Sequence, residues 1–329
     1  MILVTGATGH IGNVLVRELL STGAKVRALV LPGEDCRPLE GLQVEKFEGD
    51  ILNPASLQPA LQDVEKVFHL AGIISILPGK NELVRRVNVQ GTHNLLEAAR
   101  QAGVQRVIYT SSIHAITRAP LGMVIDERMP FDPDNTSGEY DRSKAVASLA
   151  VLKAVQEGMD AVIVCPTGVI GPYDFRGSEM GQLIYESTRK KLQFSVEGAY
   201  DFVDVRDVAR GLILAGERGR RGETYILSGE RFTIPNLVDF VRELVGVQAP
   251  HIRIPANLAH FSSLFAPLYY RLARVKPLFT SYSIKTVLGN SVISHAKAQR
   301  ELGYSARSLR ESIADTVRWF IGRQSTGEV

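Results

Sequence analysis

The chain has 329 residues, of which 45% are hydrophobic and 22% charged, and its formal net charge is +3. This length allows a large α/β unit, alone or with a smaller lobe, and the composition is that of an ordinary globular protein. Basic residues do not form a stripe with interleaved aromatic residues, so nucleic-acid binding is not expected.

The two cysteines, Cys36 and Cys165, lie far apart and belong to no CxxC pair. This usage argues against a disulfide framework and fits a reducing compartment, so we expect a cytoplasmic protein. The sequence opens directly on the apolar segment 1–4, and no signal peptide is expected. No run of about 18 uncharged apolar residues occurs, so no membrane span is expected either.

The first half of the chain alternates short apolar runs with amphipathic segments. Nearly continuous Val, Ile and Leu is typical of strands covered on both faces, and predicts strands at residues 2–4, 26–30, 44–47, 66–70, 107–110 and 161–165. Helical periodicity predicts helices at residues 11–20, 56–61, 82–102 and 143–157. The alternation predicts an α/β fold with a doubly wound parallel sheet of the Rossmann type.

The pattern changes after Pro166, where glycine and proline cluster. A helix is expected at residues 180–190, a strand at 224–227, and mostly helical structure from about residue 233. We expect residues 1–165 to form the Rossmann domain, with residues 204–228 returning to it. Residues 166–203 and 229–329 are expected to form a smaller, mostly helical lobe that binds substrate.

Three glycines, Gly6, Gly9 and Gly12, follow the first predicted strand and precede the first predicted helix. Gly6 allows a sharp turn, Gly9 lets the backbone approach a pyrophosphate, and Gly12 lets the helix pack close to the strand. The start of the helix then offers free N–H groups and partial positive charge to phosphates. No Lys-Ser/Thr pair follows the last glycine, so the motif predicts a dinucleotide site rather than a P-loop.

The end of the second predicted strand bears on the choice between NAD and NADP. An acidic residue there would bind the 2′-hydroxyl of the adenosine ribose, and an arginine would accept a 2′-phosphate. Val30 and Leu31 do neither, although charged residues lie nearby at Arg27, Glu34, Asp35 and Arg37. The sequence therefore leaves NAD versus NADP open. Asp50, after the third strand, either reaches the adenine or caps a turn.

Tyr140 and Lys144 lie four residues apart, which places them on one face of a helix. The chain has ten tyrosines, and only Tyr140 is followed by a lysine at this spacing. A lysine ammonium beside a phenol favours the phenolate, so we expect the pKa of Tyr140 to lie below its usual value of about 10. Such a pair can move a proton alongside a hydride.

Ser111 and Ser112 end the fifth predicted strand, and the carboxyl ends of parallel strands face the ligand crevice. A hydroxyl there can hydrogen-bond a carbonyl or alcohol oxygen while Tyr140 exchanges its proton. We favour Ser112 for this role, with Ser111 as the alternative. Asn88 either relays protons through water or holds a bend in its helix.

The sequence lacks the residues that other kinds of catalysis would need. The seven histidines show no metal-ligand spacing, so no metal is expected. Serine hydrolysis would need a nucleophile elbow such as G-x-S-x-G, which does not occur. His114 closely follows the predicted catalytic serine, and we expect it to line the pocket or the adjoining loop.

Together these motifs resemble the extended short-chain dehydrogenases/reductases of the NAD-dependent epimerase/dehydratase family, especially dihydroflavonol-reductase-like and 3-beta-hydroxysteroid-dehydrogenase-like members. The likeness includes residues 5–12, 67–72, 87–92, 109–112, 140–144, 166–172 and 202–209. Related sugar dehydratases have Asp-Glu after a threonine where this chain has Ser111-Ser112. Nucleotide-sugar epimerases usually carry an asparagine after the sixth strand, where this chain is more similar to the reductases.

The resemblance implies a catalytic group of Ser112, Tyr140, Lys144 and Asn88. It implies NAD(P) as cofactor, bound by the three glycines, by Tyr140 and Lys144, and by Thr8, His10, Ile11, Leu31, Asp50, Ile51, Leu70, Ala71, Gly72, Pro166, Thr167 and Val169. Reductases of this type often have arginine where Leu31 stands, which argues against a simple assignment to NADP. The resemblance also implies a homodimer that pairs through helices flanking the sheet.

The residues expected around a small-molecule substrate are mostly apolar, with Arg176 as a candidate polar anchor: Ile73, Ile74, Ile76, Leu77, Phe175, Met180, Phe202, Phe261, Phe265 and Tyr269. The apolar but interrupted stretch 258–272 is expected to pack over the pocket. The leading hypothesis is an NAD(P)-dependent oxidoreductase that interconverts an alcohol and a ketone or aldehyde on an apolar molecule. The alternatives are a sugar epimerase that uses the same groups and a non-catalytic dinucleotide sensor.

Overall fold

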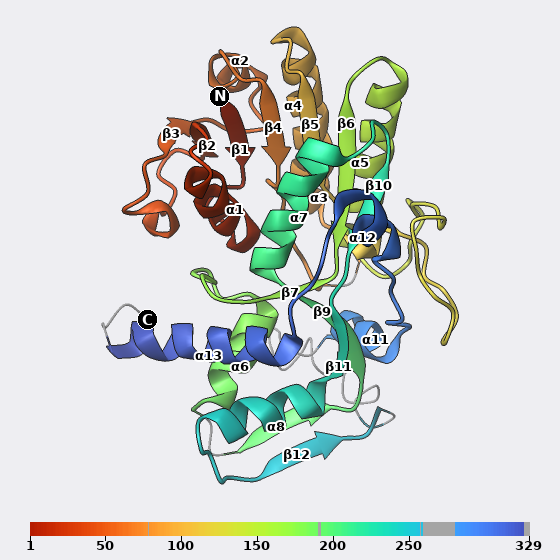
Figure 1. Ribbon diagram of the computed structural model, residues 1–329. Coiled ribbons are helices and arrows are strands. Elements are labelled where there is room, and N and C mark those ends of the chain that lie inside the picture. The colour runs from red at the N-terminus through yellow and green to blue at the C-terminus, as the bar shows by residue number, and fades with distance from the viewer. Residues whose placement is uncertain (78, 190–191, 257, 259–279, 326–329) are drawn as a thin grey trace.

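The computed structural model describes residues 1–77, 79–189, 192–256, 258 and 280–325. Its centre is a seven-stranded sheet in the order β10-β6-β5-β4-β1-β2-β3, with every neighbouring pair parallel (Figure 1). The strands are β1 (Ile2–Thr5), β2 (Val26–Val30), β3 (Glu45–Glu48), β4 (Lys66–His69), β5 (Arg106–Thr110), β6 (Ala161–Pro166) and β10 (Thr224–Leu227). The predicted α/β fold with a doubly wound parallel sheet is confirmed.

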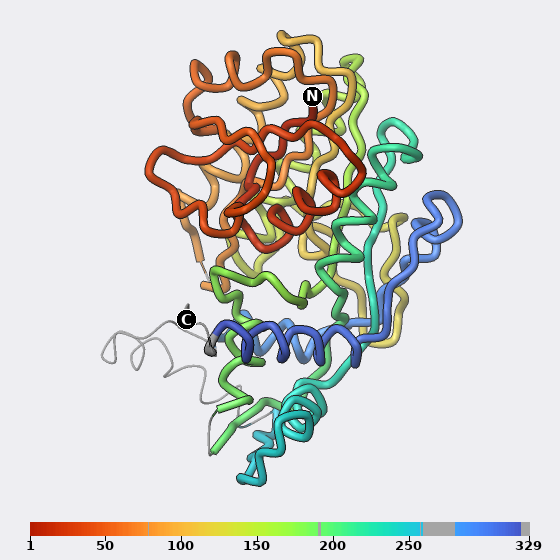
Figure 2. The backbone as a smooth tube through the Cα atoms, turned by 60° about the vertical axis from the view of Figure 1, so that its left-hand side comes forward, coloured from red at the N-terminus to blue at the C-terminus, as the bar shows by residue number. Residues whose placement is uncertain are grey.

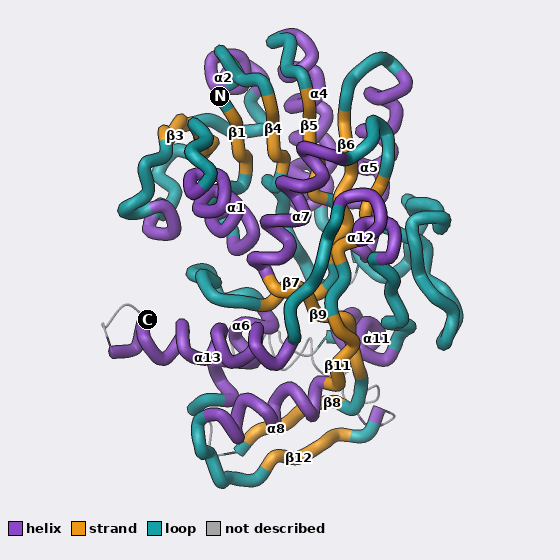
Figure 3. The backbone as a smooth tube through the Cα atoms, viewed as in Figure 1, coloured by secondary structure: helices purple, strands orange, loops and turns teal. Residues whose placement is uncertain are grey.

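Helices cover both faces of the sheet, since successive strand residues point to opposite sides (Figure 3). Val4 belongs to the core shared with α1 (His10–Ser21), α7 (Val205–Arg218) and α12 (Ala296–Leu302). Leu3 belongs to the opposite core, shared with α2 (Pro54–Ala60), α4 (Gly91–Gln101) and α5 (Glu139–Gln156). This two-sided burial explains why the strands read as continuous apolar runs.

The predicted helix 82–102 is interrupted in a way that matters for the site. It begins as α3 (Glu82–Arg85), widens into a π-helical segment at Arg86–Gln90, and continues as α4. A π-helical turn often marks a functional site, and this one contains the buried Asn88. Helix α5 begins at Glu139 rather than at the predicted residue 143, so Tyr140 lies in its first turn.

A second lobe lies at the end of the sheet toward which the strands run (Figures 1 and 2). It contains a three-stranded sheet of β7 (Gly168–Ile170), β9 (Ala199–Asp204) and β11 (Glu230–Thr233), and β8 (Gln193–Val196) paired with β12 (His251–Ile254). Its helices include α6 (Glu179–Ser187), α8 (Ile234–Leu244), α11 (Ser281–Leu288) and α13 (Leu309–Ser325). Periodicity did not predict these short strands, because each depends on a partner distant in sequence.

Strand β10 returns to the edge of the large sheet, beside β6, and α7 packs on that sheet. On this sheet membership we propose the division of the chain into residues 1–165 with 204–228, and a second lobe of residues 166–203 and 229–329. Within the described part of the chain, the helices are too short or too polar for any of them to traverse a lipid bilayer.

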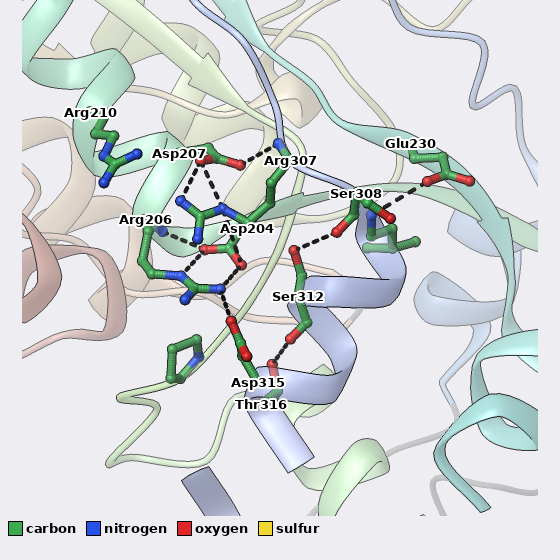
Figure 4. Close-up of polar contacts among 12 residues, drawn as sticks. Asp204, Arg206, Asp207, Arg210, Glu230, Arg307, Ser308, Ser312, Asp315 and Thr316 are labelled. Atoms are coloured by element: carbon green, nitrogen blue, oxygen red, sulfur yellow. Dashed lines mark hydrogen bonds and ion pairs between the residues drawn. The ribbon is translucent and has the colours of Figure 1, made fainter. Parts of the chain in front are cut away.

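A network of buried ion pairs joins α7 to the C-terminal segment (Figure 4). Asp204 caps α7 through the Arg206 N–H, and Arg206 also pairs with Asp315 of α13 at 2.7 Å. Arg307 pairs with Asp207 at 2.8 Å and lies 3.8 Å from Asp204. Burial opposes ionisation of Asp204, but the hydrogen bonds from Arg206 lower the pKa of its carboxyl. The network therefore holds the second lobe against the start of α7.

Removing the Arg307 side chain should destabilise the protein, because the buried carboxylate of Asp207 would lose the guanidinium that compensates its charge. We expect Arg307→Met to lower the free energy of unfolding by about 3 kcal/mol, measured by urea denaturation. Arg128→Met is the control, since Arg128 pairs with Asp126 at the surface with its side chain 89% exposed. We expect no measurable loss for that variant. Equal losses in both variants would contradict a special role for the network.

Candidate active site

The turn between β1 and α1 is built from backbone contacts that leave no room for a Cβ. Gly6 has φ +67°, and a Cβ there would lie 2.7 Å from the Ala71 nitrogen. A Cβ on Gly12 would lie 2.1 Å from the Gly6 carbonyl oxygen. A Cβ on Gly9 would lie 3.2 Å from that oxygen, so Gly9 is the least crowded of the three inside the protein. The predicted tight turn and close helix packing are therefore present.

The N-terminus of α1 is open toward the turn. Gly9 is the N-cap residue, no side chain caps the helix, and its first turn has no acidic residue. Free N–H groups and the positive end of the helix dipole favour an anion at this position. His10 and Ile11 contribute their backbone atoms to this position, because their side chains are engaged elsewhere. The His10 ring hydrogen-bonds the Pro172 carbonyl at 3.0 Å, and the Ile11 side chain packs on the core.

The end of β4 lies directly against this turn. The Thr5 hydroxyl accepts hydrogen bonds from the Leu70 and Ala71 N–H groups at 3.2 and 3.1 Å. A Cβ on Gly72 would lie 3.0 Å from Asn88 Oδ1 and 3.7 Å from Lys144 Nζ. The predicted residues 70–72 therefore connect the glycine turn to the face of α5 that carries Lys144.

Two further predicted cofactor residues lie after β3. The Asp50 carboxylate accepts a hydrogen bond from the Leu52 N–H at 2.8 Å, which is the turn-capping role weighed for it from the sequence. Ile51 is buried, lies close to Gly91, and has a carbonyl that accepts from Asn94 at 2.9 Å. Contact of Asp50 with an adenine, and of Ile51 with the cofactor, stays a prediction.

The remaining predicted cofactor residues lie where β6 passes into the second lobe. Pro166 ends β6, and Val169 lies in β7 opposite Val203. The Thr167 hydroxyl donates to Asp201 at 2.6 Å, and burial raises the pKa of the Asp201 carboxyl to about 6. The Thr167 side chain is therefore engaged with β9, and contact of residues 166, 167 and 169 with a cofactor stays a prediction.

Tyr140 and Lys144 are both buried on α5, as their spacing predicted. Lys144 Nζ donates to the Thr110 carbonyl at 2.7 Å and lies 4.9 Å from the centroid of the Tyr109 ring. Ser112 lies close enough to the Tyr140 phenol to favour its ionisation. Ser112, Tyr140 and Lys144 therefore meet at the carboxyl end of β5.

The two candidate serines have different partners. Ser111 shares a hydrogen bond of 2.7 Å with the Ser148 hydroxyl of α5. Ser112 accepts from the His114 N–H at 3.2 Å and lies close enough to Tyr140 to act on its pKa. Ser112 is therefore the serine near the phenol, whereas Ser111 is engaged with α5.

Burial dominates the ionisation of the predicted proton donor. It raises the pKa of Tyr140 to about 12, although the nearby Ser112 acts in the opposite direction. Burial also lowers the pKa of Lys144 to about 8. The predicted lowering of the Tyr140 pKa by Lys144 is wrong for this structure, because removal of the phenol from water and the negative charges of Asp141 and Glu179 favour the protonated phenol.

Asn88 has the structural role that was weighed for it from the sequence. Its amide accepts from the Ile73 N–H at 2.8 Å and donates to the Ile73 carbonyl at 3.0 Å and to Ser143 Oγ at 2.9 Å. The backbone carbonyl of Asn88 accepts a hydrogen bond from the Thr92 hydroxyl at 2.7 Å. Asn88 therefore ties the π-helical turn to the segment after β4 and to α5.

A buried carboxylate next to Tyr140 was not predicted. Asp141 is fully buried and accepts hydrogen bonds from Tyr282 Oη at 2.6 Å and from Arg118 at 3.3 Å. Its position beside Tyr140 in the sequence was a signal that could have identified it. Its partners come from loops and from α11, so spacing alone could not have found them.

His114 extends this group, as its predicted place near the pocket suggested. Its Nε2 lies 2.8 Å from the Tyr200 hydroxyl, and its Nδ1 lies 3.3 Å from that of Tyr282. The centroids of the His114 and Tyr140 rings are 6.3 Å apart. Burial lowers the pKa of His114, despite the charge of Asp141. A neutral imidazole therefore links β9 and α11 to the start of α5.

An apolar cavity of about 200 Å³ lies in the second lobe. Ile76 and Met180, both predicted near the substrate, line it together with Leu183, Phe194, Ile284 and Val287. Glu179 also lines the cavity, and its negative charge contributes to the raised pKa of Tyr140. The cavity therefore lies within electrostatic reach of the phenol.

Several predicted substrate residues lie elsewhere. Phe202 is buried in the core of the second lobe, and Phe175 packs edge-on against Trp319 with 5.3 Å between ring centroids. Arg176 is not a polar anchor in the cavity, because its guanidinium bonds Thr8 Oγ1 at 2.6 Å and pairs with Glu34. Ile73, Ile74 and Leu77 lie in the segment after β4. Phe261, Phe265 and Tyr269, with most of the stretch 258–272, lie outside the described residues.

A serine, a histidine and an aspartate align in the second lobe. Ser195 Oγ lies 2.7 Å from His251 Nε2, and His251 Nδ1 lies 2.5 Å from Asp239 Oδ1. Ser195 is fully buried within β8 rather than exposed on a turn, so the group links β8, β12 and α8 instead of forming a hydrolase centre. In the described ranges, no cluster of three or more His, Cys, Asp or Glu residues could hold a metal ion.

The model of the NAD dependent epimerase/dehydratase family matches residues 2–228 of the chain. Sterol demethylase protein B of Methylococcus capsulatus is 39% identical, covering 97% of this chain and 97% of its own length. A provisionally named dihydroflavonol 4-reductase of Synechocystis sp. is 34% identical, covering 96% and 93%. The 3-beta-hydroxysteroid dehydrogenase of Mycolicibacterium neoaurum is 30% identical, covering 92% and 86%.

Two solved structures share both lobes with this chain. The crystal structure of gox2253 has a TM-score of 0.86 and 33% identity, covering 100% of this chain and 99% of its own. MoeE5 in complex with UDP-glucose and NAD has a TM-score of 0.76 and 27% identity, covering 99% of each chain. The similarity therefore extends through the glycine turn, α5 and the second lobe together.

Alanine at Gly9 and at Gly12 should separate ligand binding from folding. At Gly9 a shift of a few tenths of an ångström relieves the new contact, but the methyl occupies space that a pyrophosphate needs. We expect the free energy of unfolding of Gly9→Ala to lie within about 1 kcal/mol of the wild-type value. We expect the variant to bind NADH at least about tenfold more weakly. Gly12→Ala should lose about 3 kcal/mol of stability, because backbone must move. Urea denaturation and fluorescence titration measure both, and unchanged NADH affinity in Gly9→Ala would contradict this assignment.

Proposed function

The chain belongs to the NAD-dependent epimerase/dehydratase family of extended short-chain dehydrogenases/reductases, and we propose that it is an NAD(P)-dependent oxidoreductase acting on a small molecule. It interconverts an alcohol and a ketone or aldehyde on a mostly apolar substrate. The observation that carries this proposal is the meeting of Ser112, Tyr140 and Lys144 beside the glycine turn.

The residues present fit a nicotinamide dinucleotide. The open N-terminus of α1 and the crowded glycine turn suit a pyrophosphate, and Lys144 lies close to Gly72 on the side of α5. A bound nicotinamide would supply the hydride exchange with the substrate carbon that bears the oxygen. We propose that residues 70–72 and 166–169 line this part of the crevice.

The protein's own groups supply the proton. With its pKa raised to about 12, Tyr140 is protonated at neutral pH and can donate to the oxygen of a carbonyl that is being reduced. Ser112 holds that oxygen by a hydrogen bond. In the opposite direction Tyr140 must be a phenolate to take the proton from the alcohol, and positive charge in the crevice, including that of Lys144, favours that phenolate.

Two residues act through their neighbours in this proposal. Asn88 positions the segment after β4 and Ser143, since its amide is bonded to both. Asp141 fixes the start of α5 through Tyr282 and Arg118. Both hold Tyr140 and Lys144 in place and need not touch the substrate.

An apolar substrate is supported by the cavity that Ile76, Met180 and Ile284 line beside the site. It is also supported by relatives named sterol demethylase protein B and 3-beta-hydroxysteroid dehydrogenase. A cavity walled by aliphatic side chains suits a fused-ring or isoprenoid skeleton better than a sugar nucleotide. We therefore propose a hydrophobic alcohol or ketone as the substrate.

A sugar epimerase is the second candidate, because the family includes epimerases and MoeE5 binds UDP-glucose with NAD. An epimerase oxidises and then reduces the same molecule, so it gives no net change in NAD(P)H absorbance. Net oxidation of NAD(P)H with apolar ketones favours the reductase, and isomerised product without net cofactor change favours the epimerase.

We further propose a cytoplasmic homodimer paired through helices that flank the sheet.

Tyr140→Phe tests the mechanism directly. The variant keeps the ring but lacks the proton, so we expect kcat to fall by about 10²- to 10⁴-fold while NADH affinity stays within about threefold. Turnover is followed by NAD(P)H absorbance and binding by fluorescence titration. A variant with wild-type turnover would sink the proposal that Tyr140 is the acid.

The neighbouring serines provide a matched pair. Ser112→Ala removes the hydroxyl that lies near the Tyr140 phenol, and we expect turnover to fall about 10²-fold with little change in stability. Ser111→Ala removes a buried bond to Ser148, and we expect a loss of about 1 kcal/mol of stability with turnover largely kept. Steady-state rates and thermal unfolding distinguish the two. The reverse pattern would assign the catalytic role to Ser111.

A further inference from the structure

A carboxylate bridges the glycine turn and the end of β2. Glu34 lies beyond the strand, but its side chain folds back and is only 16% exposed. Its Oε2 accepts from the Leu31 N–H at 2.9 Å, and its Oε1 accepts from the Thr8 hydroxyl at 2.7 Å. Two bonds from different elements therefore hold the carboxylate in the gap between them.

This gap is where the adenosine ribose of a dinucleotide lies in a Rossmann domain. A carboxylate there accepts hydrogen bonds from the 2′-hydroxyl, and a 2′-phosphate needs a cation instead. Leu31, directly after β2, has an aliphatic side chain that is 48% exposed and offers neither. We propose that Glu34 takes the acceptor role and makes this enzyme select NAD(H) over NADP(H). The inference rests on the proposed function only in requiring that a nicotinamide dinucleotide binds.

Electrostatics favours the same outcome. A 2′-phosphate would add negative charge beside a carboxylate that is already held in place, and like charges in a crevice discriminate against the wrong ligand. The nearby arginines have acidic partners: Arg27 pairs with Glu45 at 2.8 Å and Arg37 pairs with Asp35 at 2.7 Å. Neither guanidinium lies at the Glu34 carboxylate.

Arg176 is the competing feature. It comes from the segment after β7 and reaches both Thr8 and the Glu34 carboxylate. If it served to bind a 2′-phosphate, the preference would be the opposite one. Its pairing with Glu34 instead indicates that it orients the carboxylate and connects the second lobe to the glycine turn.

The test compares the dissociation constants of NADH and NADPH for the purified full-length protein by fluorescence titration. We expect wild type to bind NADH at least about tenfold more tightly. Glu34→Gln keeps the shape and removes the charge, so we expect the ratio to fall to within about threefold. Leu31→Arg combined with Glu34→Gln should bind NADPH more tightly than NADH. Circular dichroism confirms that each variant is folded.

Asp35→Asn is the control, because this neighbouring carboxylate pairs with Arg37 on the surface and should leave the ratio unchanged. Equal or tighter binding of NADPH by wild type would overturn the inference, as would an unchanged ratio in Glu34→Gln. If Arg176→Gln lost affinity for NADPH but not for NADH, the site would be assigned to a 2′-phosphate and the inference would also be overturned. Binding of neither nucleotide would overturn the proposed function as well, which distinguishes the two failures.

Discussion

The site depends on close approaches at three glycines, where the neighbouring atoms leave no room for a Cβ. Gly6 lies against residues 70–71, Gly12 lies against the Gly6 carbonyl, and Gly72 lies against Asn88 and close to Lys144. A Cβ at any of the three would come within 3.0 Å of a neighbouring atom. These contacts bring the ends of β1 and β4 and the inner face of α5 together. The distance between the glycine turn and the Tyr140–Lys144 pair therefore depends on glycine as much as on the reactive groups.

Burial then sets the chemistry of those groups. Tyr140, Asp141 and Lys144 are each less than 10% exposed, and removal from water disfavours their charged forms unless a partner compensates. Asp141 has Tyr282 and Arg118, Lys144 has the Thr110 carbonyl, and Tyr140 stays protonated. Such groups cost stability in return for reactivity. The ion pairs of α7 with the C-terminal segment help hold the second lobe that closes this environment.

Much of the site could be predicted from the sequence, because its main signals are local. The glycine spacing, the Tyr140–Lys144 spacing and the two serines at the end of β5 each lie within one element or one turn. The preference for Ser112 over Ser111 stays a prediction, which the contact of Ser111 with Ser148 supports. The expected fall in the Tyr140 pKa was wrong, because spacing shows that a lysine is near but not how much water is lost. Arg176 was placed at the substrate, whereas it reaches Glu34.

By itself the sequence determined the α/β class, the parallel sheet, the glycine turn and the helix that carries Tyr140 and Lys144. These follow from periodicity and from steric limits that act within a few residues. Only the tertiary structure decided that Glu34 folds back onto Thr8, that Asp141 meets Tyr282, and that an apolar cavity forms in the second lobe. Those contacts join residues far apart in the chain, and their energies depend on burial, which no local pattern records.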